Sequence, residues 1–172
     1  VAEGLAPGEH RLEVYRRTEA LFGVTSFLGV EVEGGRLLAP EPVPASRVEV
    51  VGDSISCGYG NEGTTPDCRF SPATENHCAS YGAVLARTLG AELSTVAWSG
   101  RGVVRNYAGS PGEHLGALYG RTLPESPATT WSQRESNDLV IVNLGTNDFS
   151  TEPDPDAGEF VRGYVALLEQ IR

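Results

Sequence analysis

The chain has 172 residues and a formal net charge of −10, with 13 basic residues, all of them Arg, against 23 acidic ones. This length allows one domain or two small ones. Because the arginines form no cluster, neither nucleic acid nor an anionic membrane surface is an expected partner. Apolar runs such as residues 139–142 are too short to span a bilayer. With 40% hydrophobic residues, the chain can form a packed core.

The first 46 residues have the pattern of a β-structure. Residues 9–18 and 26–38 alternate roughly between apolar and polar side chains, with a Gly-Gly turn at 34–35 in the second segment. Alternation of this kind predicts antiparallel strands with one solvent-exposed face. A stiff linker with three prolines follows at residues 39–44. We therefore expect one structural unit over residues 1–46 and another from residue 47 onward.

From residue 47 the pattern changes to alternating strands and helices. Short apolar segments predict strands at residues 48–52, 93–98 and 139–142. The third segment is apolar on both faces, which predicts a central, parallel strand. The order of strands and helices is typical of a parallel α/β sheet, in which functional sites lie at the carboxyl ends of the strands.

Two helices are predicted between and after these strands. Ser80 is a candidate N-cap, and the residues after it form one helical face: Tyr81, Val84, Leu85 and Leu89. Asp156 and Glu159 form a possible capping box. A strong apolar stripe follows it up to the end of the chain: Phe160, Tyr164, Leu167, Leu168 and Ile171.

Three loops leave the predicted strand ends, at residues 52–61, 98–102 and 143–148. Each loop is a weak signal by itself, because Gly-rich turns are common. Together they can provide what acyl transfer requires, an attacking hydroxyl group and hydrogen-bond donors for the oxyanion. Ser54 is the candidate nucleophile. The candidate oxyanion donors are the backbone N–H groups of Ser54 and Gly100 and the side-chain amide of Asn147.

These loops resemble the sequence blocks of the SGNH (GDSL-type) hydrolases, and the longer strings are most similar to carbohydrate esterase family 2. The strings are Gly52-Asp-Ser-Ile-Ser-Cys-Gly-Tyr-Gly60, Thr74-Glu75-Asn76, Ser99-Gly-Arg-Gly-Val103 and Asn143-Leu-Gly-Thr-Asn-Asp148. The resemblance implies a flavodoxin-like, three-layer α/β hydrolase domain over residues 47–172. It also implies that residues 1–46 are the end of a β-sandwich (jelly-roll) domain plus the Pro-rich linker.

The activity implied by this resemblance is that of a secreted or exported serine esterase. Such an enzyme removes acetyl groups from cell-wall polysaccharides or oligosaccharides through an acyl-enzyme on Ser54, and it needs no metal or other cofactor. Two alternatives remain open. One is a non-catalytic carbohydrate-binding protein on the same fold, and the other is a GDSL-type lipase or acylhydrolase acting on other esters.

Other residues have candidate supporting roles. The resemblance implies that Asp53 braces the loops, and Asp148 is a structural residue or a contact to a sugar hydroxyl. Tyr107, Tyr119 and Trp131 are candidates for stacking on a sugar ring, although aromatic residues of this kind also serve as core or cover. Trp98 is expected in the core.

The resemblance further implies a general-base His near the C-terminus, usually three residues after an Asp. None of the histidines of this chain (His10, His77 and His114) holds that position. The chain has no Met, starts at Val1, and ends within its last predicted helix. We therefore expect a fragment of a longer protein, truncated before the base and inactive by itself.

The three cysteines, Cys57, Cys68 and Cys78, match no C-x-x-C pattern. They are either three reduced thiols or one disulfide plus one free cysteine. The family resemblance favours a Cys57–Cys68 pair.

Overall fold

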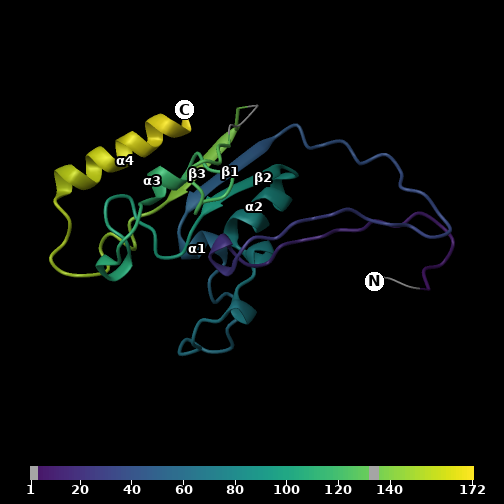
Figure 1. Ribbon diagram of the computed structural model, residues 1–172, viewed down its shortest axis with the longest axis horizontal. Coiled ribbons are helices and arrows are strands. Elements are labelled where there is room, and N and C mark those ends of the chain that lie inside the picture. The colour runs from purple at the N-terminus through teal and green to yellow at the C-terminus, as the bar shows by residue number, and fades with distance from the viewer. Residues whose placement is uncertain (1–3, 132–135) are drawn as a thin grey trace.

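A three-stranded parallel sheet forms the centre of the computed structural model, which describes residues 4–131 and 136–172. Strand β1 (Arg47–Gly52) lies between β2 (Glu92–Ala97) and β3 (Leu139–Asn143) (Figure 1). Gly52 is in register with both Ala97 and Asn143, so the three carboxyl ends meet at one edge. The predicted parallel α/β sheet is thereby confirmed.

One detail of the sheet prediction is wrong: β1, and not β3, is the central strand of the described sheet. The reason is that helices cover both faces of a parallel sheet. In the described residues β3 is half-buried, with Leu139 40% exposed. Apolar side chains on both faces of a strand do not show how many strands lie beside it.

Helices cover the sheet on two faces and give a three-layer arrangement (Figure 1). Helix α2 (Tyr81–Leu89) packs against β1 and β2, while α3 (Leu115–Leu118) and α4 (Ala157–Ile171) contact each other on the opposite face. The remaining helical turns are short: η1 (Ala20–Phe22), α1 (Ser54–Cys57), η2 (Pro72–Thr74), η3 (His77–Ala79) and η4 (Tyr107–Gly109).

Both predicted helix starts are present. The Ser80 hydroxyl accepts a hydrogen bond from the Ala83 N–H, and the Asp156 carboxylate accepts one from the Glu159 N–H at 2.9 Å. Helix α2, however, packs with its small residues, Gly82, Ala83 and Ala86, rather than with its large ones. A Cβ atom on Gly82 would lie 2.8 Å from Val50 Cγ2, so glycine is what allows this close approach to β1.

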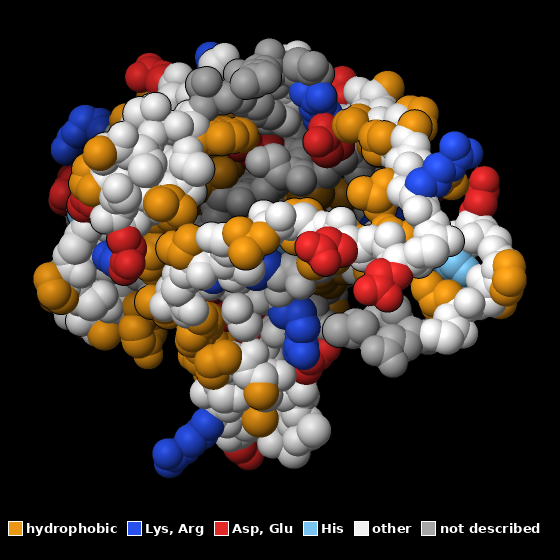
Figure 2. All heavy atoms as spheres, turned by 45° about the vertical axis from the view of Figure 1, so that its right-hand side comes forward, with side chains coloured by type: hydrophobic (Ala, Val, Ile, Leu, Met, Phe, Trp, Pro, Cys, Tyr) orange, Lys and Arg blue, Asp and Glu red, His pale blue; other side chains and the backbone are white. Residues whose placement is uncertain are grey.

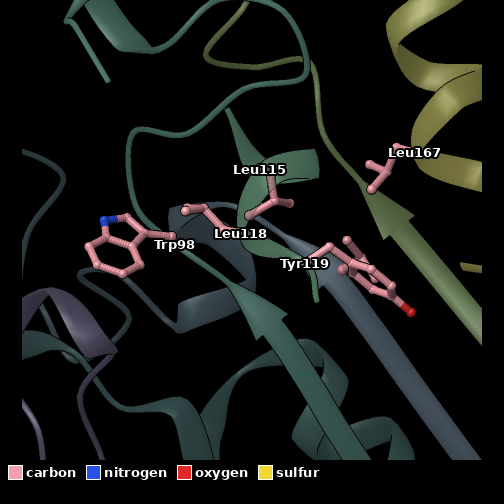
Figure 3. Packing of buried hydrophobic residues seen from close by; sticks show 6 residues of the cluster. Trp98, Leu115, Leu118, Tyr119 and Leu167 are labelled. Atoms are coloured by element: carbon pink, nitrogen blue, oxygen red, sulfur yellow. The ribbon is translucent and has the colours of Figure 1, made fainter. Parts of the chain in front are cut away.

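The main apolar core lies between the sheet and the α3–α4 layer. Figure 3 shows Leu115 and Leu118 of α3 between Trp98, at the end of β2, and Leu167 of α4. Trp98 is 4% exposed, which confirms that it is a core residue.

The N-terminal segment differs from the prediction. Residues 4–46 contain the short turn η1 and no strand, so the strands predicted at 9–18 and 26–38 are absent. A strand requires a hydrogen-bonded partner, and the described part of the chain offers none to these two segments. They extend away from the sheet (Figure 1), and many of their apolar side chains are exposed. The predicted nature of residues 1–46 as a separate domain stays a prediction.

Figure 2, in which this extended part comes forward, shows hydrophobic side chains at the surface and basic side chains scattered singly among acidic ones. No helix among the described residues is long and apolar enough to cross a lipid bilayer.

Candidate active site

Ser54 lies where β1 ends, as the first residue of α1, and it is half-buried. The turn from strand to helix is tight, since a Cβ atom on Gly52 would come within 1.9 Å of Ser56 Oγ. Asp53 caps α1 by accepting a hydrogen bond from the Ile55 N–H at 3.0 Å. The Ser54 N–H belongs to the first turn, where helix N–H groups lack an intrahelical acceptor, and no described residue accepts its hydrogen bond. It is therefore available to a ligand.

The loop after β2 presents a second free backbone donor. Gly100 has φ +79°, in the left-handed region that favours glycine, and its carbonyl accepts a hydrogen bond from the Tyr107 N–H at 2.8 Å. Among the described residues, nothing accepts a hydrogen bond from the Gly100 N–H. This loop is tightly folded, because a Cβ atom on Gly102 would lie 2.0 Å from the Arg105 carbonyl oxygen.

Asn147, which follows β3, joins these two loops. Its side chain is 4% exposed, and Nδ2 donates to the Arg101 carbonyl at 2.8 Å and to Asp53 Oδ2 at 3.3 Å. Arg101 is next to Gly100 and Asp53 is next to Ser54. The structure thus brings Ser54, Gly100 and Asn147 to the same edge of the sheet, as their positions at strand ends predict.

Asp148 holds the loop after β2 in place. It is fully buried, and its carboxylate accepts hydrogen bonds from the backbone N–H groups of Val103, Val104 and Arg105 at 2.7–3.0 Å. The Arg105 guanidinium in turn donates to the Asp148 carbonyl. Of the two roles predicted for Asp148, this geometry fits the structural one, since a sugar hydroxyl has no access to it.

The electrostatics of Asp53 follow from its burial. Burial raises the pKa of its carboxyl group, the Ile55 N–H opposes that shift, and the nearby Asp148 charge adds to it. The ionised form of Asp53 is therefore held by few partners, of which the Asn147 amide is one.

None of the three histidines hydrogen-bonds to Ser54. His10 is exposed and pairs with the Ala6 carbonyl, and His114 precedes α3 without capping it. Burial lowers the pKa of His77. His77 lines a cavity of about 360 Å³ on the β2 side, together with Glu19 and Cys57, and Ser54 is not part of its lining.

The aromatic candidates separate into one residue at the site and two away from it. Tyr107 is 60% exposed and follows the Gly100 loop, so it can contact a ligand there. Tyr119 is buried, and its hydroxyl group donates to the buried Glu49 carboxylate at 3.0–3.2 Å. The backbone N–H of Trp131 donates to the carbonyl of Gly120, which is next to Tyr119.

Tyr119 is therefore corrected as a substrate-binding candidate, whereas the role of Trp131, whose side chain is 37% exposed, stays a prediction. Glu49 lies three residues before Gly52 in β1, a distance of about 10 Å along a strand, so this region is toward the amino end of the sheet. Apolar and aromatic residues of an irregular segment cannot be assigned to one end of a sheet without knowing where the chain passes.

Two features near the site were missed by sequence reasoning. The Tyr59 ring stacks on the Phe70 ring, with centroids 3.5 Å apart. Tyr59 lies beside Ser54, because its backbone N–H donates to the Ser54 carbonyl. Glu19 and Glu75 form a buried pair next to Ser99. The string Thr74-Glu75-Asn76 was a signal for the second feature, but nothing in the sequence relates it to Glu19.

The cysteine prediction is also corrected, because all three cysteines are free. Cys57 is buried as the last residue of α1, whereas Cys68 is exposed on the following loop.

Comparison of the sequence with known protein families assigns the chain to a family. Residues 50–172 match the GDSL-like Lipase/Acylhydrolase family. The chain belongs to this family. Residues 1–42 of this GDSL-type hydrolase match the N-terminal domain of carbohydrate esterase family 2. The predicted resemblance is thereby confirmed.

Two curated relatives and one solved structure show which members of the family are similar. The chain is 43% identical to the cellulase/esterase CelE of Acetivibrio thermocellus over 173 residues, covering 100% of this chain and 21% of that protein. It is 30% identical to an acetylxylan esterase / glucomannan deacetylase of Cellvibrio japonicus, covering 98% of this chain and 50% of that protein. A family two carbohydrate esterase from Clostridium thermocellum, solved with cellohexaose, superposes with a TM-score of 0.86 at 43% identity, over 91% of this chain and 48% of that one.

This GDSL-type hydrolase therefore spans half or less of the length of these curated relatives. Within the described ranges, no group of three His, Cys, Asp or Glu side chains could hold a metal ion.

Proposed function

We propose that the protein is a carbohydrate O-deacetylase, a serine esterase that removes acetyl groups from a cell-wall polysaccharide or oligosaccharide. The observation that carries this proposal is the Ser54 hydroxyl at the sheet edge, next to the Asn147 amide and two backbone N–H groups that find no acceptor among the described residues. This is the donor arrangement that a tetrahedral oxyanion requires. The printed names of the relatives, an acetylxylan esterase / glucomannan deacetylase among them, support an acetylated carbohydrate as the substrate.

In this mechanism Ser54 Oγ attacks the carbonyl carbon of the acetyl ester and loses its proton to a general base. The oxyanion accepts hydrogen bonds from the N–H groups of Ser54 and Gly100 and from Asn147 Nδ2. For Asn147, the long bond to Asp53 is the one for which the oxyanion competes. The C–O bond to the sugar then breaks, and the base returns the proton to the sugar oxygen. Water hydrolyses the acetyl-Ser54 ester to acetate and regenerates the hydroxyl group.

The base in this proposal is a histidine outside residues 1–172, since none of the three present is hydrogen-bonded to Ser54 in the structure. We also propose that the protein acts outside the cytoplasm, where cell-wall polysaccharides are found.

A second candidate function is carbohydrate binding without catalysis. The observation that favours it is the exposed Tyr107 ring at the edge of the site. A third, hydrolysis of other esters, is the alternative that the family match alone allows.

The test is hydrolysis of an aryl acetate and of an acetylated xylo- or gluco-oligosaccharide by the complete protein. Ser54→Ala is expected to abolish turnover of both, and Asn147→Ala to lower kcat by about 10²–10³-fold, the usual cost of one oxyanion donor. Ser110→Ala, at an exposed position, serves as the matched control and should retain full activity. His77→Ala should also remain active.

Three results would contradict the proposal in different ways. Binding of the oligosaccharide without Ser54-dependent turnover would support the non-catalytic function. Turnover of the aryl ester or of fatty acyl esters, but not of acetylated sugars, would support the broader esterase. Loss of activity in His77→Ala would make His77 the base.

A further inference from the structure

Two buried carboxyl groups meet between the N-terminal segment and the loop that carries Gly100. Glu75 has no exposed surface and Glu19 is 8% exposed. The Glu19 N–H donates to Glu75 Oε1 at 2.5 Å, and Glu19 Oε2 accepts from the Ser99 N–H at 2.7 Å. The proposed mechanism uses neither residue.

Each carboxyl group keeps one buried oxygen for which no described residue is a hydrogen-bond partner, Glu19 Oε1 and Glu75 Oε2. Burial of such an atom without a partner is costly. A proton held on one carboxyl group supplies the missing donor for the other. Burial raises the pKa of Glu75 to about 7, and the charge of the Glu19 carboxylate adds to this shift.

We propose that Glu19 and Glu75 share one proton and, as a pair, position the Ser99–Gly100 backbone that provides an oxyanion donor. This inference rests on the proposed esterase function. Glu19 holds the Ser99 N–H directly, and the peptide unit that follows carries the Gly100 N–H. Glu75 holds Glu19 in place from the other side. Both are positioning residues, since neither lies among the groups that would touch the substrate.

The neighbourhood of the pair decides how it titrates. On its own segment, the Arg16 guanidinium is bonded to the carbonyls of Thr18, Glu19 and Gly23, and its charge opposes the rise in the pKa of Glu75. Arg17 donates to the Glu75 carbonyl at 3.3 Å and pairs with the exposed Glu62.

On the hydrolase side, the Cys57 thiol faces both carboxyl groups, and burial raises its pKa strongly. His77 and Arg121 line the adjoining cavity, where burial lowers the pKa of His77. Burial raises the pKa of Tyr59, and the charges of Glu19 and Glu75 add to that shift. The charge of Asp53 also contributes to the raised pKa of Cys57. Arg16 is thus the cation acting directly on the pair, and the pair keeps a proton until the pH rises past about 7.

Loss of that proton places two negative charges in contact, and their repulsion displaces Glu19 from Ser99. The kcat of the complete protein is therefore expected to fall above pH 7. In Glu75→Gln the amide donates to Glu19 permanently, so this alkaline decrease should disappear while kcat near pH 6.5 stays within about 3-fold of wild type. Glu75→Ala removes the donor, and kcat should fall about 10-fold with little change in KM, less than the full loss of an oxyanion donor. Glu62→Gln changes an exposed acid that pairs with Arg17, and this variant should behave as wild type.

An unchanged alkaline decrease in Glu75→Gln, or an unchanged kcat in Glu75→Ala, would overturn the pairing. A second measurement is independent of catalysis. In Ser54→Ala, the amide NMR signals of Ser99 and Gly100 should titrate together with the Glu75 carboxyl carbon, and this titration should vanish when Glu75→Gln is added. If wild type shows no Ser54-dependent turnover, the proposed function fails. If these amide signals do not titrate, the proton-sharing pair fails.

Discussion

The hydroxyl group of Tyr119 stabilises the fold by satisfying a buried carboxylate. Glu49 lies in the central strand with no exposed surface, and burial raises the pKa of its carboxyl group. Its partners include Tyr119 and Asn137, whose donated hydrogen bonds oppose that shift. Tyr119 is thus bound to the interior and is not available to a sugar.

Replacing Tyr119 by Phe should lower the free energy of unfolding by about 1–3 kcal/mol, because one acceptor of a buried carboxylate loses its donor. Urea unfolding of the complete protein measures this change. Tyr15→Phe, at an exposed hydroxyl paired with Glu13, should change stability little. Equal stabilities for the two variants would show that water satisfies Glu49.

Tyr107, in contrast to Tyr119, should contribute to ligand binding and little to the stability of the fold. Its ring is exposed beside Gly100. Stacking on a ring contributes about 0.5–1.5 kcal/mol, so Tyr107→Ala should raise KM for an acetylated oligosaccharide by about 2- to 12-fold. The small aryl acetate should be affected much less. A change of the same size for both substrates would mean that Tyr107 positions the Gly100 loop instead.

At the level of elements, the loop between β2 and η4 depends on glycine where the chain is most crowded. A Cβ atom on Gly102 would collide with the Arg105 carbonyl and would lie 2.5 Å from Asp148 Oδ2. Asp148 Oδ2 is one of the two oxygens through which Asp148 holds the loop, since it accepts a hydrogen bond from the Val103 N–H. The loop therefore has little freedom to relax around an added methyl group.

Gly102→Ala is expected to displace the Gly100 backbone and to lower kcat by about 10-fold or more, since oxyanion donors work only at the right position. Hydrolysis of the aryl acetate by the folded variant measures the effect. Gly120→Ala is the matched control, because a Cβ atom there meets no described neighbour. Wild-type kcat in Gly102→Ala would separate this loop from catalysis.

The sequence was sufficient to predict the three strands of the sheet, the two capped helices and the loops at the carboxyl ends of these strands, but not the N-terminal segment, where the expected strands are absent. These features depend on local patterns: apolar runs, the Ser80 and Asp156 caps, and Gly at tight turns. The positions of Tyr119 and Trp131 could not be predicted, because they depend on the path of an irregular segment. The Glu19–Glu75 contact joins residues 56 positions apart in the sequence, and no periodicity relates two such residues. The order of the strands was missed for a similar reason, because the hydropathy of a strand does not show which strands pair with it.

For the whole molecule, the raised pKa of Glu75 makes stability depend on pH. An unfolded Glu loses its proton near pH 4.5, whereas folded Glu75 keeps it until about pH 7. The folded state therefore binds more protons over this interval, and the free energy of unfolding must fall as pH rises through it. The stabilisation from protonated Glu75 is complete below pH 4.5 and is lost above pH 7.

Urea unfolding of wild type and Glu75→Gln at several values between pH 5 and pH 8 measures this contribution. The decrease should be smaller in Glu75→Gln, while Glu31→Gln, at an exposed position, should follow wild type. Parallel curves for wild type and Glu75→Gln would mean that Glu75 has an ordinary pKa in the folded protein.

The hydrogen bond from Ser99 to Glu19 has a consequence for how this protein can be recombined. The acceptor lies within the match to the family two N-terminal domain, and the donor lies within the match to the hydrolase family. A chimera that joined this hydrolase domain to an N-terminal domain without an acid at position 19 would inherit half of a buried pair. Glu19 and Glu75 therefore have to be exchanged together, as one unit that spans the two family matches.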